Sequence, residues 1–451
     1  MFSNLVLLSV LLGVVEVLPQ HTGIAAQSDL ARLSLKRSNG CIVRLISSKP
    51  KVCIIGGGFA GLNAAQQLKS GDYDVTVVDP EPYVEWLPNV HEIISGIKNG
   101  EELRLDRRRI VQRLGHRFEQ TCATDLNAAA VTLANGKIVS FDACIVSTGG
   151  VANYFGVEGV SAHAIGMKSV DDCQRIAKKL RMGSLGHKTT RVAVVGGGIE
   201  GVEALGEALR AYRYKPQFEF YMVDNHQKVL SGCAGNLDSQ VKSHVRNFSV
   251  DFQLGSRVSE VHKEGITLDN GKVVHSDVTI WSGGVAPSSL LYNAQLADGP
   301  DQWGEVNYAF QSRHYDNVFV VGDAAKTPKP LSKQAFHAID MGRFAGQNVA
   351  RYLSGRRLKK FEASFKPQVV TFGDMDTFMV FDGFSVSSSV LGAAKEAVYT
   401  LGLLQLSPPD NPKDFMRSVD LLQKSLRKVY IPAVNPLNLV SKLPKAKFFR
   451  R

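Results

Sequence analysis

Apolar, strand-like runs alternate with helix-like segments along most of the 451-residue chain. Residues 52–55 form a short apolar run that ends in glycines, and helix-forming residues follow at 62–68. The same order recurs at 191–203, and each unit has a second apolar run downstream, at 73–79 and 218–224. Strands that alternate with helices are typical of a parallel α/β sheet. The pattern therefore predicts an α/β fold with two similar units.

The turn of the first unit has the spacing Gly-x-Gly-x-x-Gly. In a strand–turn–helix that binds a dinucleotide, Gly56 permits the tight turn, Gly58 lets a pyrophosphate approach the backbone, and Gly61 lets helix and strand pack closely. The exposed N–H groups and the helix dipole attract phosphate. Asp79 follows eighteen residues after Gly61, where such folds place the carboxylate that binds ribose hydroxyls. These residues predict a Rossmann-like cradle; the alternative is a glycine-rich loop without a ligand.

The second unit repeats these features 140 residues later, with Gly196, Gly198, Gly201 and the strand-ending Asp224. Two complete fingerprints imply two dinucleotides, or one resident cofactor and one mobile one. A carboxylate at Asp224 repels a 2′-phosphate, so it favours NADH over NADPH. No Arg or Lys follows it until Lys228, which supports the same preference.

Each unit is followed by a hairpin and an apolar strand that ends in small residues. Asn-Gly turns at 135–136 and 270–271 mark the hairpins, and the strands end at 147–149 and 282–284. A further apolar run ends in Gly-Asp323, and a helix with small packing residues is expected from about Lys333 to Leu353.

The first 50 residues have the composition of a targeting presequence. An apolar run at 5–18, interrupted by Glu16, and small residues at 24–26 resemble a secretory signal. Residues 27–50 are basic, contain serine and nearly lack acids, as transit peptides do. We expect delivery to an organelle, plastid or mitochondrion, with the secretory pathway as the alternative.

Residues 366–451 differ in pattern and predict an additional α+β region. Residues 367–384 alternate as in a hairpin, whereas the apolar stretch 384–406 contains Lys395 and Glu396, which argue against a membrane span. Residues 415–429 predict a basic amphipathic helix. With the basic tail, this helix favours an anionic membrane surface, or it packs on its own domain.

The net charge of +11 is concentrated at the two ends of the chain. Residues 28–51 hold six Lys or Arg and one Asp, and residues 411–451 hold ten Lys or Arg and two Asp. The charge therefore concerns targeting and surface attachment, and with no nucleic-acid motif in the sequence we exclude nucleic-acid binding. The basic run 104–109 is interpreted as a solvated face. Six cysteines lack metal-ligand spacing, so we expect no metal and interpret them as reduced structural residues.

Taken together, these segments resemble the two-dinucleotide flavoprotein superfamily of pyridine-nucleotide oxidoreductases. The matching segments, in family order, are Gly56–Gly61, Ser147–Gly149, Gly196–Glu203, Trp281–Val285 and Val321–Asp323. The resemblance implies an FAD-binding domain made of residues 51–165 and 285–365. An NAD(P)H-binding domain, residues 166–284, is inserted between its two parts.

Within this superfamily the chain is most similar to type II NADH dehydrogenases and to apoptosis-inducing-factor-like or ferroptosis-suppressor-like quinone reductases. Disulfide reductases and sulfide:quinone reductases need redox cysteines, but none lies between residues 54 and 121 or after Cys233. The segment 333–342 departs from the glutamine-rich signature of type II NADH dehydrogenases, with Phe336, Asp340 and Met341 in place of the glutamines. That departure leaves the acceptor open.

The resemblance also implies a role for each candidate residue. Those expected to hold FAD are Gly56, Gly58, Phe59, Ala60, Gly61, Asp79, Thr148, Gly149, Gly284, Asp323 and Ala335. Those expected to hold NADH are Gly196, Gly198, Ile199, Gly201 and Asp224. Lys333 and Glu203 are the candidate catalytic residues, with Glu203 beside the nicotinamide or, alternatively, an ordinary acid near a helix start. His91 and His337 are interpreted as structural.

The implied function is electron transfer from NADH through FAD to a quinone or similar small acceptor. Two alternatives remain open: an NADH-binding flavoprotein with a signalling role, and a ferredoxin or rubredoxin reductase. The expected partners are the acceptor and a membrane surface reached through the basic tail. A homodimer is compatible with this interpretation.

Overall fold

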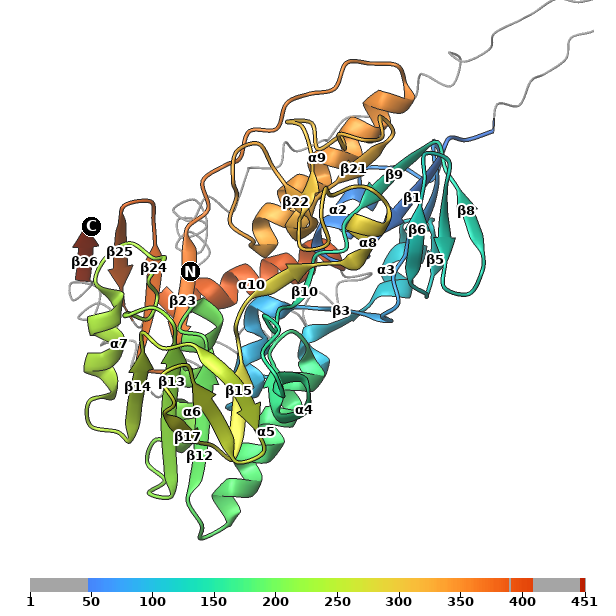
Figure 1. The fold of residues 1–451 in the computed structure, drawn as a ribbon. Coiled ribbons are helices and arrows are strands. Elements are labelled where there is room, and N and C mark those ends of the chain that lie inside the picture. Colours follow the sequence, from blue (N-terminus) through green and yellow to red (C-terminus); the bar gives the residue numbers. More distant parts are fainter. Residues whose placement is uncertain (1–47, 389–390, 409–446, 451) are drawn as a thin grey trace, which may run out of the picture.

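The protein is described here from a computed structural model that covers residues 48–388, 391–408 and 447–450 (Figure 1). Two parallel five-stranded sheets form its two main parts. In Figure 1 the first sheet lies at the upper right and the second at the lower left.

Two distant segments of the chain build the first sheet. Strand β1 (Lys51–Ile55) lies in its middle and pairs in parallel with β2 (Asp74–Val78) and β9 (Ala143–Val146). Strand β5 (Arg117–Glu119) extends the sheet beyond β2. Strand β21 (Val318–Val320) pairs in parallel with β9 at the other edge, so the segment after the second sheet returns to complete the first.

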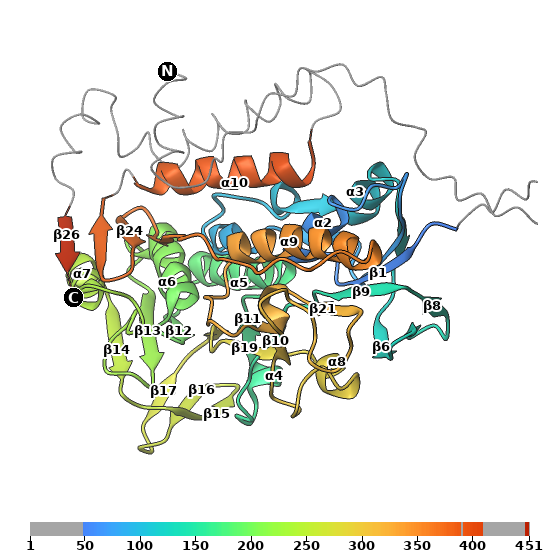
Figure 2. The same cartoon turned by 90° about the horizontal axis from the view of Figure 1, so that it is seen from above.

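Helices α2 (Phe59–Ala65) and α9 (Ala335–Leu353) pack tightly against each other beside this sheet (Figure 2). A Cβ on Gly342 would overlap the Ala60 backbone, so the missing side chain is what allows the close approach. The helix expected from about Lys333 is therefore confirmed, and it begins at Ala335.

The second sheet repeats the first. All its neighbouring strands are parallel, in the order β11-β18-β12-β13-β14. Its strands are β11 (Ala164–Gly166), β12 (Thr190–Val195), β13 (Phe218–Asp224), β14 (Val250–Leu254) and β18 (Val278–Trp281). Its helices are α5 (Val170–Leu185), α6 (Ile199–Tyr212) and α7 (Leu237–Val245).

Both sheets carry an antiparallel three-stranded extension, as the Asn-Gly turns predicted. Gly136 and Gly271 have φ of +81° and +82°, a conformation that favours glycine. The extensions are β6 (Ala123–Leu126), β7 (Ala130–Leu133) and β8 (Ile138–Ser140), and β15 (Val258–His262), β16 (Gly265–Leu268) and β17 (Val273–His275). The chain crosses between the two parts in β10 (Gly150–Ala152) and β19 (Val285–Pro287), which pair with each other.

Short elements complete the two parts. They are β3 (Tyr83–Glu85), η1 (Leu87–Ile93), η2 (Glu101–Leu103), β4 (Arg104–Asp106), α3 (Arg107–Arg113), α4 (Val160–His163), α8 (Ser289–Asn293), β20 (Gly304–Glu305), η3 (Gly322–Ala324) and β22 (Ala325–Lys326).

The C-terminal region contacts both parts. Its antiparallel sheet contains β23 (Gln368–Phe372), β24 (Asp376–Val380), β25 (Phe384–Ser387) and β26 (Lys447–Arg450), so the expected hairpin is confirmed. Helix α10 (Gly392–Leu406) runs lengthwise over the side of α2 and α9 (Figure 2), and β23 packs on α6. Within the described residues, no helix is both long enough and apolar enough to span a membrane. The expected presequence and the amphipathic helix at 415–429 fall outside those residues.

These features confirm the predicted fold class: two Rossmann-like units with an additional C-terminal α+β region. The domain limits stay a prediction, and β11 already pairs within the second sheet. Cys53 and Cys144 are fully buried on neighbouring strands, as their apolar surroundings suggested.

Candidate active site

The first glycine turn forms an open cradle between β1 and α2. Gly56 has φ of +95°, and a Cβ there would overlap the Ser147 carbonyl. Gly61 is equally confined, because its Cβ would overlap the Gly56 carbonyl oxygen. Gly58, in contrast, faces open space, and no side chain caps the start of α2 at Phe59. Gly56 and Gly57 donate their N–H groups to Val78 and Asp79, so the N–H groups at the start of α2 are the ones placed to meet a phosphate group.

Asp79 is held by the protein around it. One carboxylate oxygen accepts the Gly57 N–H at 2.7 Å, and the other accepts the Glu81 N–H at 2.9 Å and pairs with Arg107. Arg107 is only 5% exposed, and its Nε donates to the Gly57 carbonyl at 2.9 Å. The interpretation of the basic run 104–109 as a solvated face is thus wrong for Arg107, which orders the expected ribose-binding carboxylate.

Residues 147–149 close this cradle from the end of β9. Ser147 Oγ donates to the Ile55 and Gly56 carbonyls at 3.0 and 2.7 Å and so fixes the turn. The Thr148 hydroxyl oxygen is buried and has no hydrogen-bond partner among the described residues. Leaving such a group unpaired costs roughly 1–3 kcal/mol, which a polar ligand group would remove. The cradle therefore fits a dinucleotide where the resemblance places FAD.

The second cradle is built in the same way between β12 and α6. A Cβ on Gly196 (φ +108°) would lie 2.6 Å from the Ser282 carbonyl oxygen, and Gly201 is confined by Gly196. Ser282 Oγ donates to the Val195 and Gly196 carbonyls at 2.9 and 3.1 Å, as Ser147 does in the first cradle. Gly198 again faces open space, and Ile199 begins α6 without a side-chain cap.

Asp224 ends β13 at the position that Asp79 has after β2. Its carboxylate accepts the Gly197 N–H at 2.5 Å and both the backbone N–H and the Nδ1 of His226, at 2.7 and 2.8 Å. The acid expected at the NADH ribose is therefore in place beside its glycine turn. Gly284 (φ +115°) lies where the chain leaves this sheet for β19.

Asp323 and Lys333 line a small pocket at the start of α9. Lys333 donates to the Asp323 carbonyl oxygen, and its Nζ lies 3.3 Å from the centre of the Trp303 ring. Burial raises the pKa of the Asp323 carboxyl, which Lys333 opposes, and burial lowers the pKa of Lys333. Ala335 begins α9 without a side-chain cap, so the positive end of a 19-residue helix lies at this pocket.

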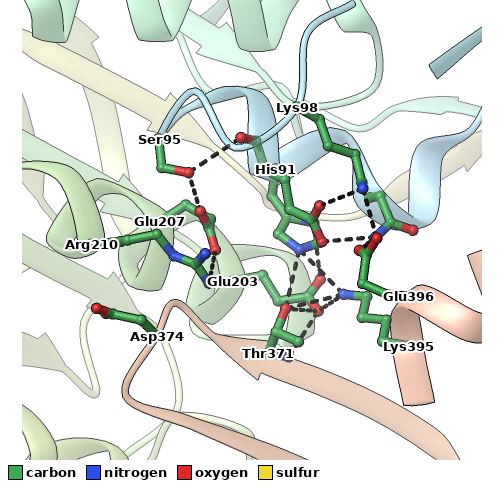
Figure 3. A network of polar contacts seen from close by, with 12 residues as sticks. His91, Ser95, Lys98, Glu203, Glu207, Arg210, Thr371, Asp374, Lys395 and Glu396 are labelled. Atoms are coloured by element: carbon green, nitrogen blue, oxygen red, sulfur yellow. Dashed lines mark hydrogen bonds and ion pairs between the residues drawn. The ribbon is translucent and has the colours of Figure 1, made fainter. Parts of the chain in front are cut away.

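Glu203 is buried between four elements (Figure 3). Lys395 Nζ from α10 lies 2.5 Å from its Oε1, and the Thr371 N–H from β23 donates to the same oxygen at 3.1 Å. His91 Nδ1 from η1 lies 3.5 Å from its Oε2. The Glu203 side chain is 7% exposed, unlike an ordinary acid on a helix surface.

Burial controls the titration of these groups. It raises the pKa of Glu203, whereas Lys395 lowers it. Burial, reinforced by Lys395, lowers the pKa of His91 well below its usual value, so this imidazole is neutral at pH 7. His91, interpreted from sequence as structural, thus contacts a candidate catalytic residue.

Further charged side chains surround this group. Lys98 Nζ lies 2.8 Å from Glu396 and 3.5 Å from Glu92, and Arg210 lies 3.1 Å from Glu207. Burial raises the pKa of Glu207 and of Glu396 to about 7 each. The hydrogen bonds and ion pairs join ten residues that we call the buried ionic cluster: His91, Glu92, Ser95, Lys98, Glu203, Glu207, Arg210, Thr371, Lys395 and Glu396.

Residues 50–342 match the family described as pyridine nucleotide-disulphide oxidoreductase, and this span includes both cradles. The chain belongs to this family. The resemblance inferred from the glycine turns is therefore confirmed at the level of the superfamily.

Individual relatives of this family are distant in sequence. A type II NADH:quinone oxidoreductase of Staphylococcus aureus (strain MSSA476) is 23% identical over 371 residues, which cover 75% of this chain and 91% of that protein. The solved structure of NDH2 from Plasmodium falciparum in complex with NADH has a TM-score of 0.74 at 16% identity, covering 85% of this chain and 99% of that one. The sulfide:quinone oxidoreductase of Aquifex aeolicus has a TM-score of 0.63 at 16% identity, with coverages of 87% and 95%.

The family match ends before the C-terminal part of the site, and the sequence interpretation also missed it. Lys395 and Glu396 served there only to argue against a membrane span. Their signal was a pair of charges in a largely apolar helix, which requires buried partners. Arg107 gave no such signal, because its neighbours in the basic run are exposed or half-buried.

Proposed function

We propose that this protein is a non-proton-pumping NADH:quinone oxidoreductase, which passes electrons from NADH through FAD to a quinone. One observation carries the proposal: two complete dinucleotide cradles are linked by the paired strands β10 and β19. Two cradles allow a resident cofactor and a mobile one to meet. The name and coverage of the Staphylococcus aureus relative support the quinone as acceptor.

The first cradle holds FAD in this proposal. Backbone N–H groups of residues 58–61 bind its pyrophosphate, and Asp79, oriented by Arg107, binds the adenosine ribose. The Thr148 hydroxyl, which has no partner among the described residues, forms a hydrogen bond with FAD. The Asp323 carboxylate accepts hydrogen bonds from the ribityl hydroxyls. When bound, FAD supplies the redox chemistry, accepting a hydride and releasing electrons. Lys333 and the start of α9 provide the positive charge that favours an anionic flavin.

The second cradle holds NADH. Residues 198–201 bind the pyrophosphate, and Asp224 binds the adenosine ribose and disfavours NADPH. Glu203 lies five residues beyond Gly198 along α6, or about 7.5 Å at the rise of an α-helix. With the resemblance, this position supports a role for Glu203 beside the nicotinamide.

The overall reaction, NADH + H⁺ + quinone → NAD⁺ + quinol, takes up one proton. Glu203 is suited to hold a proton at its carboxyl group, because burial favours the neutral form and Lys395 favours the charged one.

An anaerobic titration of the purified, flavin-loaded protein tests this function. NADH should bleach the flavin absorbance, and NADPH should do so at much higher concentration. A short-chain quinone should then restore the absorbance and support turnover many-fold faster than oxygen alone. A reduced flavin that persists with every quinone would refute the quinone as acceptor and favour a binding or signalling role. Salt-sensitive reduction of an acidic ferredoxin instead would favour a ferredoxin reductase.

We further propose that the protein acts in an organelle, on a membrane surface. The composition of residues 1–50 supports import, and the basic residues of 411–451 support attachment to anionic lipid. A fluorescent fusion tests the first point. Flotation with anionic and with neutral vesicles, comparing the full chain with one truncated after residue 408, tests the second. Sedimentation of the same samples decides between a monomer and a homodimer.

A further inference from the structure

The two cradles differ at one place inside the glycine turn. The residue before the last glycine is Ala60 in the first cradle and Glu200 in the second. Ala60 is buried against α9, whereas the Glu200 side chain is 45% exposed at the start of α6. A carboxylate at this position would repel the pyrophosphate of an incoming dinucleotide. The second cradle therefore needs a compensating charge.

Lys168 supplies that charge. Its ammonium group forms an ion pair with Glu200, and its side chain is 26% exposed. Lys168 follows the carboxyl end of β11, and Glu200 follows that of β12. Because β18 lies between these two strands, the ion pair spans the end of β18. Ligands of parallel α/β sheets bind at this edge.

The same pair also influences a carboxyl group of the first cradle. Burial is the main cause of the raised pKa of Asp323, and after Lys333 the next influences are Lys168, which lowers it, and Glu200, which raises it. Asp323 belongs to η3, at the end of the first sheet. Lys168 and Glu200 are thus near enough to Asp323 to influence its pKa.

We propose that Lys168 binds the diphosphate of NADH and that Glu200 is the partner of Lys168 only while the ligand is absent. The inference rests on the proposed function of the second cradle. Lysine meets a phosphate as a point charge on a flexible stem, so it can turn from Glu200 to the ligand without a backbone change. The bound diphosphate then replaces Glu200 as the partner of Lys168.

Binding of NAD⁺ to the flavin-loaded full-length protein, measured by calorimetry, tests this without turnover. Lys168→Met should raise the Kd about tenfold, as expected for loss of one charge-assisted contact. Lys168→Arg should stay within about threefold of wild type. Glu200→Gln should lower the Kd, because it removes the carboxylate that repels the diphosphate. In the Glu200→Gln background, Lys168→Met should raise the Kd by a smaller factor than in wild type. Lys178→Met removes an exposed charge further along α5 and should change the Kd less than about twofold.

Steady-state kinetics add a second measurement: the effect of Lys168→Met should appear in KM for NADH and not in kcat. Flavin absorbance and thermal unfolding verify that each variant is folded and loaded. The inference is overturned if Lys168→Met behaves like Lys178→Met, or if Glu200→Gln weakens binding as much as Lys168→Met does. If the wild-type protein binds NAD⁺ but reduces no quinone, only the proposal of a quinone acceptor is refuted. A wild-type protein that binds no NAD⁺ would overturn both the inference and the proposed function.

Discussion

Replacing Lys395 with Met should leave the Glu203 carboxylate buried without its charged partner in the buried ionic cluster. The Lys395 and Glu203 side chains are 9% and 7% exposed and lie 2.5 Å apart. Removing one member of a buried ion pair costs about 3–5 kcal/mol, because the other charge stays buried without its partner. Thr371 still donates to Glu203 through its N–H and hydroxyl at 3.1 and 3.3 Å, which favours the lower end, about 3 kcal/mol.

The cost should depend on pH with a definite sign. Without Lys395 the pKa of Glu203 rises further above its unfolded value, because burial then acts unopposed. The folded state therefore holds a proton that the unfolded state releases, so stability is lost as pH rises. The penalty of Lys395→Met should be larger at pH 8 than at pH 5.

Urea unfolding of Lys395→Met, Glu203→Gln and the double variant forms the assay. The double variant should recover most of the loss, since the stranded charge is gone. Lys242→Met is the matched control, because it breaks a pair with Asp238 in which Lys242 is 38% exposed, and it should cost at most about 0.5 kcal/mol. The reasoning is refuted if Lys395→Met costs no more than this control, or costs the same with and without the Glu203 carboxylate.

Three further predictions concern the cradles and the cluster. Gly58→Ala should fold but lose flavin absorbance, because the added methyl group meets no protein atom and occupies the open space proposed for the pyrophosphate. Gly61→Ala should reduce soluble expression, because its Cβ would overlap the Gly56 carbonyl oxygen. Equal soluble yields of the two variants would contradict this reasoning. Burial raises the pKa of Glu207 to about 7, so between about pH 4.5 and 7 the folded protein holds a proton that the unfolded chain releases, and stability falls as pH rises. Glu207→Gln should weaken this fall. An unchanged pH profile of unfolding midpoints would count against the prediction. Asp224→Ser should raise the kcat/KM ratio of NADPH to NADH about tenfold or more, and an unaltered ratio would exclude Asp224 from the ribose site.

The parts of the fold that depend on local pattern were predictable. Glycine spacing, strand-ending acids and Asn-Gly turns each follow from backbone geometry within a few residues, and both cradles and both hairpin extensions appear where those signals lie. The internal repeat strengthened the prediction, because the same combination of local signals occurs twice.

The parts that depend on distant pairing were not predictable. Glu203 meets Lys395 across 192 residues of sequence, and His91 meets Thr371 across 280. The residues around each partner give no indication of which distant residue it contacts. Arg107 illustrates the same limit, since burial against Gly57 selects it from a run of similar residues.

The position of Lys395 near the end of the chain has a consequence for biosynthesis. Both cradles are complete once residue 353 has left the ribosome, yet among the described residues made by then no Lys or Arg pairs with Glu203. Only when α10 emerges and lies across α2 and α9 does the ammonium group reach the carboxylate. Translation therefore completes both cradles well before it supplies the cation that pairs with Glu203. A chain terminated before α10 would contain both cradles but would leave the Glu203 carboxylate without Lys395.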